Sequence, residues 1–66
     1  MTVFVNNQEV EVPSEASVLD VLSQVGMAGD GVAVAVDNKV LPRAMWPRRA
    51  AEQGMRLTVI RAVCGG

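Results

Sequence analysis

A single change of hydrophobic period, just after Pro13, does most to limit the folds open to this 66-residue chain. Before Pro13, apolar residues alternate with other residues, as they do in a half-buried strand. After it, apolar residues recur at helical spacing, at Val18, Val21, Leu22 and Val25. Alternation then returns in later strand segments, and residues 43–53 between them predict an irregular turn or a short 3₁₀ segment. One amphipathic helix among strand segments predicts a two-layer α+β domain, with the helix packed on one face of a sheet.

Turn residues separate the predicted strands. Residues 2–12 are interrupted by Asn6-Asn7, a pair that tolerates positive φ, and this pattern predicts a β-hairpin. Valine then alternates with alanine in a third strand, which is followed by a second turn and a short return strand. These later segments are the strand at 32–36, the turn at Asp37-Asn38, the return strand at 40–41 and the last strand at 57–63.

The helix has recognisable ends. Ser17 suits the N-cap position, Asp20 three residues later resembles a capping box, and Gly26 suits the helix terminus. A right-handed crossover through this helix allows the last strand to lie in the middle of the sheet, parallel to the first. We therefore predict a β-grasp fold, with a mixed sheet of four to five strands and one crossover helix on one face.

The composition argues against an independent enzyme. The chain has no His and no Tyr, so the commonest general base and metal ligand is missing. A single Cys excludes an internal disulfide framework and a Cys-rich zinc site. A chain of this length has room for one core and little room for a deep cleft. We expect no catalytic residue, no metal site and no bound cofactor.

Charge is distributed unevenly. All six basic residues lie from Lys39 onward, accompanied there by one acid, Glu52. A basic half can indicate nucleic-acid binding, but the aromatic residues that would stack on bases are nearly absent. A solvated face is the simpler interpretation, and steering toward an acidic partner is the alternative. Without an evident signal peptide or a long apolar run, we expect a cytoplasmic protein that is monomeric when free.

The chain ends in Val63-Cys64-Gly65-Gly66. Glycine has no Cβ, so such an end can thread a slot that is too narrow for other residues. We predict a β-grasp domain over residues 1–62 and a flexible tail over 63–66, whose terminal carboxylate is a substrate for another protein's active site. The alternative is an ordinary frayed terminus.

Several short motifs, in a fixed order along nearly the whole chain, together resemble the ThiS branch of the ubiquitin-like sulfur carrier family. The motifs are Val5-Asn6, the segment 17–22, the segment 32–37, Val40-Leu41-Pro42-Arg43, Trp46, Gly54 before 57–60, and the terminal Gly65-Gly66. One departure is Met55, which follows Gly54 where the family commonly has Asp; we expect it to lie in a turn and to matter little.

The resemblance implies a chemistry for Gly66. An adenylating enzyme of the ubiquitin-activating type would use ATP to convert the carboxylate into an acyl-adenylate. A persulfide donor would then supply sulfur and leave a thiocarboxylate, which a thiazole synthase would accept for thiamine. The alternatives are sulfur transfer to a siderophore-like metabolite, an amino acid or molybdopterin, or a role as a ubiquitin-like modifier or interaction module.

Cys64 precedes the two terminal glycines, where small apolar or polar residues are more usual in the family. The simpler interpretation is a tolerated small side chain on the tail. The functional one is that its thiol attacks the activated Gly66 carbonyl, or forms a mixed disulfide with a sulfur donor. The tail residues expected to enter a partner's active site are Cys64, Gly65 and Gly66.

Exposed residues of the sheet suggest where partners dock. If Val3 and Leu57 face the helix, then Phe4 and Ile60 lie on adjacent strands of the open face, with Thr58 beside them. Arg61 would make a contact at the rim of this surface.

Two further residues are expected to act within the fold. Trp46 is expected to anchor one end of the core, because a lone Trp most often buries its large surface. For Arg43, an ion pair with the acidic half of the chain is as plausible as a contact with a partner.

Overall fold

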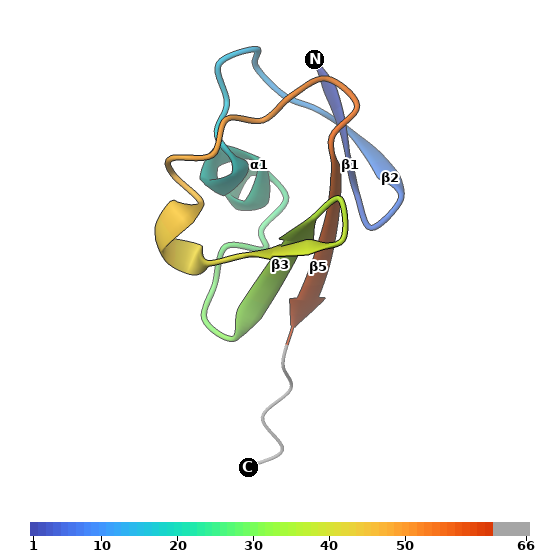
Figure 1. The fold of residues 1–66 in the computed structure, drawn as a ribbon. Coiled ribbons are helices and arrows are strands. Elements are labelled where there is room, and N and C mark those ends of the chain that lie inside the picture. Colours follow the sequence, from blue (N-terminus) through green and yellow to red (C-terminus); the bar gives the residue numbers. More distant parts are fainter. Residues whose placement is uncertain (62–66) are drawn as a thin grey trace.

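The computed structural model describes residues 1–61, so the predicted tail at 63–66 lies outside the described residues. The predicted division after residue 62 remains a prediction for the same reason. Five strands and one α-helix form the two layers expected, with the helix against one face of the sheet (Figure 1). The elements are β1 (Thr2–Val5), β2 (Gln8–Glu11), α1 (Val18–Gln24), β3 (Val32–Val36), β4 (Lys39–Leu41), the 3₁₀ turn η1 (Arg43–Met45) and β5 (Arg56–Arg61).

The last strand lies in the centre of the sheet. The strand order is β2-β1-β5-β3-β4, with β5 parallel to β1 and antiparallel to β3. Phe4 is paired with Arg56 on the β1 side, and Val32 is paired with Arg61 on the β3 side. The predicted β-grasp topology is therefore confirmed, with five strands.

Two tight hairpin turns set the strand registers. Asn6 and Asn7 have φ of 51° and 69°, and Asp37 and Asn38 have φ of 49° and 70°. Two consecutive residues of positive φ form the two-residue turn that matches the twist of antiparallel strands, and Asn and Asp tolerate this conformation better than most residues. Both predicted turns are confirmed.

The helix is capped as its sequence predicts. The Ser17 Oγ accepts the Asp20 N–H at 3.1 Å, and the Asp20 carboxylate accepts the Ser17 N–H at 2.9 Å. At the other end Gly26 has φ of 74°, and the Met27 N–H donates to the Leu22 carbonyl at 2.8 Å. These bonds satisfy backbone groups that a seven-residue helix would otherwise leave open at both ends.

The core lies between α1 and one face of the sheet. Its largest fully buried side chains are Trp46, Leu22, Leu57, Val3, Val18, Val21 and Val34. Trp46 is 1% exposed, which confirms the predicted anchor, and its Nε1 donates to the Leu41 carbonyl at 3.1 Å.

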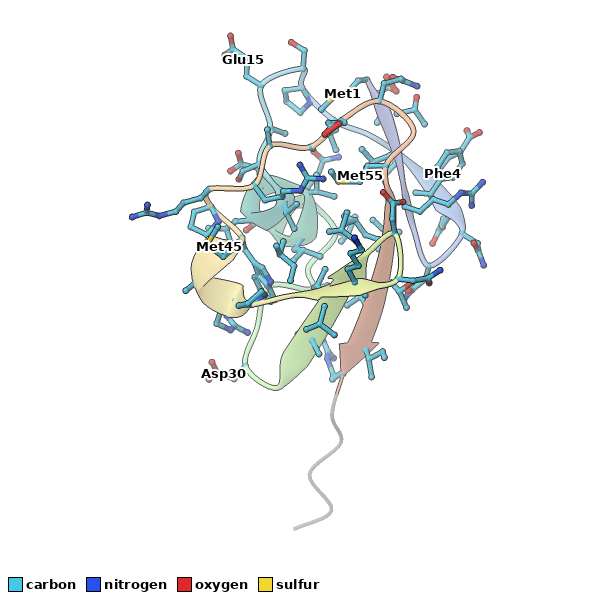
Figure 2. The ribbon with its side chains drawn as sticks, viewed as in Figure 1. Met1, Phe4, Glu15, Asp30, Met45 and Met55 are labelled. Carbon is cyan, nitrogen blue, oxygen red and sulfur yellow. The ribbon has the colours of Figure 1, made fainter. Side chains whose placement is uncertain are left out.

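Two single residues differ from what the sequence suggested. The Met55 N–H closes the expected turn by donating to the Glu52 carbonyl at 3.0 Å, but the expectation that Met55 matters little was wrong, because its side chain is 5% exposed and belongs to the core (Figure 2). Of the two roles considered for Arg43, the ion pair with the acidic half of the chain does not form within residues 1–61. Arg43 donates instead to the carbonyls of Ala28 and Gly29, and its guanidinium lies over the Trp46 ring.

Candidate functional site

β5 connects the core to the residues of functional interest. It begins beside the two hairpin turns and ends at Arg61, five residues before Gly66. Its arrowhead points away from the N-terminus, so the C-terminal residues start at the opposite end of the domain from Met1 (Figure 1). Neighbouring strands on both sides hold β5 in the sheet. A rigid element therefore leads toward the predicted site of modification.

The open face of the sheet carries the exposed residues of β5. Leu57 is 2% exposed and faces the helix, whereas Thr58 is exposed and Ile60 is 61% exposed. Side chains alternate between the two faces of a strand, so Arg56, Thr58 and Ile60 share the face opposite α1. The predicted assignment of β5 residues to faces is confirmed for these positions.

Phe4 and Ile60 lie on adjacent strands of the open face, as predicted, but they are not neighbours. The register of the parallel strands places Phe4 opposite Arg56, whose guanidinium carbon lies 4.9 Å from the centre of the phenyl ring. Ile60 lies four residues farther along β5, about 13 Å away at the rise of a strand. Its partner is Ala33 of β3. Phe4 therefore shares the open face without touching Ile60.

Val40 completes an apolar surface that the sequence analysis missed. It is 79% exposed and pairs with Ala35, which in turn pairs with Thr58 across β3 and β5. Directly paired residues project to the same face, so an apolar surface crosses β5, β3 and β4. We call it the open-face patch and define it by Ala33, Ala35, Val40 and Ile60. The sequence carries no local signal for this surface, because Val40 and Leu41 are both apolar and only the register of β4 against β3 separates their faces.

Arg61 does not lie at the rim of the open-face patch. Two residues beyond half-buried Val59, it has the same orientation as Val59 and Leu57, toward the helix side. There it lines a groove of about 320 Å³ beside Val25 and Met27. The predicted rim contact at Arg61 was therefore wrong, because the alternation of side chains along β5 turns Arg61 to the helix side.

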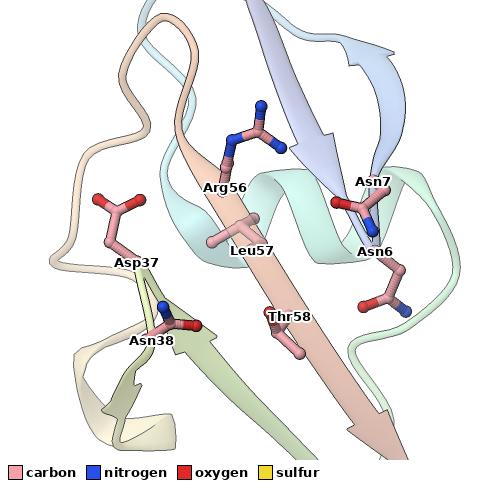
Figure 3. Close-up of a pocket in the computed structure, with 7 residues that line it drawn as sticks. All are labelled: Asn6, Asn7, Asp37, Asn38, Arg56, Leu57 and Thr58. Carbon is pink, nitrogen blue, oxygen red and sulfur yellow. The ribbon is translucent and has the colours of Figure 1, made fainter.

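A polar hollow of about 390 Å³ lies at the other end of β5 (Figure 3). Asn6 and Asn7 border it on one side of β5, and Asp37 and Asn38 border it on the other. Its remaining lining comes from Arg56, Leu57 and Thr58. The hollow lies at the start of β5, remote from the strand end that continues into the C-terminal residues.

Residues 1–61 contain neither a cluster of metal ligands nor a helix that could cross a membrane. Across residues 1–61, no group of three or more His, Cys, Asp or Glu side chains is placed to hold a metal ion. Within the same part of the chain, no helix has the length and apolar character that a membrane crossing requires.

Comparison with known proteins gives a consistent result. The family model described as "ThiS family" matches residues 2–66. The sulfur carrier protein ThiS of Escherichia coli (strain K12) is 23% identical over 66 residues, which cover the whole of both chains. The crystal structure of a thiamine biosynthesis protein (ThiS) from Geobacter metallireducens superposes with a TM-score of 0.81, at 23% identity and with full coverage of both chains.

Proposed function

Because the chain belongs to the ThiS family, we propose that it is a sulfur carrier, a protein co-substrate that presents sulfur on the terminal carboxyl group of Gly66. The observation that carries this proposal is the central position of β5, which leads from the core toward a chain end of two glycines. The curated relative that matches over its full length is itself named a sulfur carrier protein. In this role the protein has no catalytic activity of its own.

The chemistry begins with activation of an unreactive group. The Gly66 carboxylate attacks the α-phosphorus of ATP in the active site of an adenylating enzyme, giving an acyl-adenylate and releasing pyrophosphate. The terminal sulfur of a persulfide on the donor enzyme then displaces AMP and forms an acyl disulfide. A second thiol of the donor cleaves the S–S bond, which leaves a thiocarboxylate on Gly66 and a disulfide on the donor. ATP is thus a substrate of the partner, and the carrier needs no cofactor.

The length of chain after β5 suits this role. Five residues follow Arg61, and at full extension they span about 17 Å. That reach allows Gly66 to enter a buried active site while the folded domain docks outside it. Gly65 and Gly66 have no side chains, so a narrow entrance admits them. Cys64 is the first tail side chain that the entrance would have to accommodate.

The open-face patch is the surface that we assign to partner docking. Ile60 and Val40 are its two large apolar side chains, 61% and 79% exposed, and the small side chains of Ala33 and Ala35 lie on the strand between them. Ile60 lies one residue before the end of β5, so a partner seated there is close to the start of the C-terminal residues. Thr58 belongs to the same surface. Phe4, stacked on Arg56, lies outside it, and Arg61 would contact a partner only around the end of the strand.

The acceptor that we propose is a thiazole synthase, so that the sulfur enters the thiazole of thiamine. Support comes from the names of the matching proteins, one a sulfur carrier and the other a thiamine biosynthesis protein. The carrier would act in the cytoplasm, where ATP and an adenylating partner are present together.

Adenylation tests the proposal at its first step. Mixed with a ThiS-type adenylating enzyme, ATP and labelled pyrophosphate, the carrier should stimulate exchange of the label into ATP. Gly66→Val should abolish the exchange, because a β-branched side chain beside the carboxylate blocks a slot shaped for glycine. The unfolding midpoint of this variant should equal that of the unmodified sequence. Exchange that proceeds equally with Gly66→Val would refute the proposed role of the terminal carboxylate.

A further inference from the structure

The side chain of Asn6 makes a two-point contact with the backbone of Val59. The Val59 N–H donates to the Asn6 Oδ1 at 2.8 Å, and the Asn6 Nδ2 donates to the Val59 carbonyl at 3.2 Å. Fifty-three residues separate the two in sequence. The amide group of Asn6 therefore binds Val59 with one donor and one acceptor, as a peptide group would.

This contact continues the ladder between β1 and β5 after the backbone of β1 has turned away. The Phe4 N–H donates to the Met55 carbonyl at 2.8 Å, and the Asn6 N–H donates to the Leu57 carbonyl at 2.9 Å. The next carbonyl in this series belongs to Val59. At Asn6 the chain enters the hairpin turn with φ of 51°, so the side chain supplies the donor there in place of the backbone.

The contact lies where the burial of β5 decreases toward its end. Leu57 is 2% exposed, but Val59 is only half-buried and Arg61 is exposed. The helix ends at Gln24, and a groove of about 320 Å³ lies between the turn that follows it and the end of β5. On the β3 side, pairing continues to Val32 and Arg61. On the β1 side, the contact beyond Leu57 is the amide of Asn6.

We propose that Asn6 is a positioning residue for the modification of Gly66. Through its contact with Val59 it fixes the direction of the end of β5, from which the C-terminal residues continue. This inference rests on the proposed function. Asn6 touches neither the carboxylate nor, in the proposed complex, the reacting atoms. Its contribution is to hold the last part of β5 parallel to β1. A docked carrier then presents its terminus to the partner's active site more often than a carrier without this contact would.

Glycine substitutions at the two turn positions provide a matched test. Both Asn6 and Asn7 have positive φ, which glycine adopts without strain, so Asn6→Gly and Asn7→Gly both preserve the turn. Only Asn6→Gly removes the contact with Val59. Within residues 1–61, the Asn7 side chain is exposed and has no hydrogen bond to lose. Asn6→Asp is the conservative variant, since it retains the acceptor for the Val59 N–H and loses the donor.

The kinetic readout is adenylation by a ThiS-type adenylating enzyme, measured at a temperature at which circular dichroism shows every variant folded. For Asn6→Gly we expect kcat to fall about fivefold or more. A change of this size lies within the free energy that two ordinary hydrogen bonds contribute. KM should stay within about twofold, because the docking surface is intact. Asn6→Asp should lie between Asn6→Gly and the unmodified sequence, and Asn7→Gly should match the unmodified sequence.

Amide exchange measured by NMR gives a readout that is independent of any partner. In Asn6→Gly the Val59 N–H should exchange faster, whereas the Phe4 N–H, which belongs to an earlier step of the same ladder, should not change. Equal kcat for the two glycine variants, or a rise in KM without a fall in kcat, would overturn the positioning role. If the unmodified sequence were not adenylated at all, the proposed function would fail, and the exchange data would still decide whether Asn6 orders the end of β5.

Discussion

The guanidinium of Arg43 lies over the Trp46 ring, with its central carbon 4.4 Å from the centre of the indole. The same guanidinium donates to the carbonyls of Ala28 and Gly29, in the loop that follows α1. One side chain thus connects η1, the buried Trp and the loop between α1 and β3. The Pro42-Arg43 and Trp46 motif therefore closes one end of the core.

We expect Arg43→Lys to destabilise the domain by about 1 kcal/mol. A lysine keeps the charge, but it lacks the planar fork that stacks on the indole and reaches two carbonyls. Urea unfolding followed by Trp46 fluorescence measures the change. Arg48→Lys is the control, because Arg48 is exposed like Arg43 but does not stack on an aromatic ring within the described residues. Equal stability of the two variants would show that the stacking contributes nothing.

Met55→Ala should lower the free energy of unfolding by about 2 to 3 kcal/mol, because it removes a core side chain and leaves a cavity. Met55 is 5% exposed. The control is Met45→Ala, which makes the same chemical change at a side chain that is 44% exposed and should cost less than about 0.5 kcal/mol. Thermal unfolding of the pair checks the difference. Similar losses at both positions would contradict the placement of Met55 in the core.

Ile60→Glu should leave the fold intact and raise KM for adenylation about tenfold or more, because it replaces one of the two large apolar side chains of the open-face patch with a charged one. Ile60 is 61% exposed, so its replacement opens no cavity. Ser23→Glu adds the same charge on an exposed position of the helix, away from the patch, and should leave KM unchanged. If Ile60→Glu were adenylated at the normal rate while folded, partners would dock on another surface.

Cys64→Ala should still acquire the thiocarboxylate, because the group that is modified is the carboxylate of Gly66. Cys64 lies outside the described residues, so this prediction rests on the chemistry alone. Mass spectrometry of the C-terminal peptide after reaction with the adenylating enzyme, ATP and a persulfide donor measures it. Normal pyrophosphate release, which reports adenylation, without sulfur incorporation would instead make the Cys64 thiol part of the transfer.

Local signals in the sequence were sufficient for the turns and the helix ends. Asn6-Asn7 and Asp37-Asn38 predicted turns because few other residues tolerate two successive positive φ values. Ser17 and Asp20 predicted the helix start through their reciprocal hydrogen bonds. These features depend on residues close together in the chain, so the sequence alone shows them.

Features that depend on register between distant strands could not be predicted in the same way. Phe4 and Ile60 were correctly assigned to one face, but only the parallel register shows that Phe4 meets Arg56 instead. Val40 joins Ile60 in one patch through the intervening strand β3, a relationship with no local sequence signal. The contact between Asn6 and Val59 likewise links positions that no periodicity brings together.

The most direct test of the sulfur carrier proposal is the intact mass of the protein after incubation with a ThiS-type adenylating enzyme, ATP and a persulfide donor. We predict the mass gain that corresponds to exchange of one oxygen for sulfur, located by fragmentation at Gly66 and dependent on ATP. An unchanged mass under conditions in which the same enzymes modify the Escherichia coli sulfur carrier would contradict the proposal. So would a Gly66 found in amide linkage to a lysine of another chain.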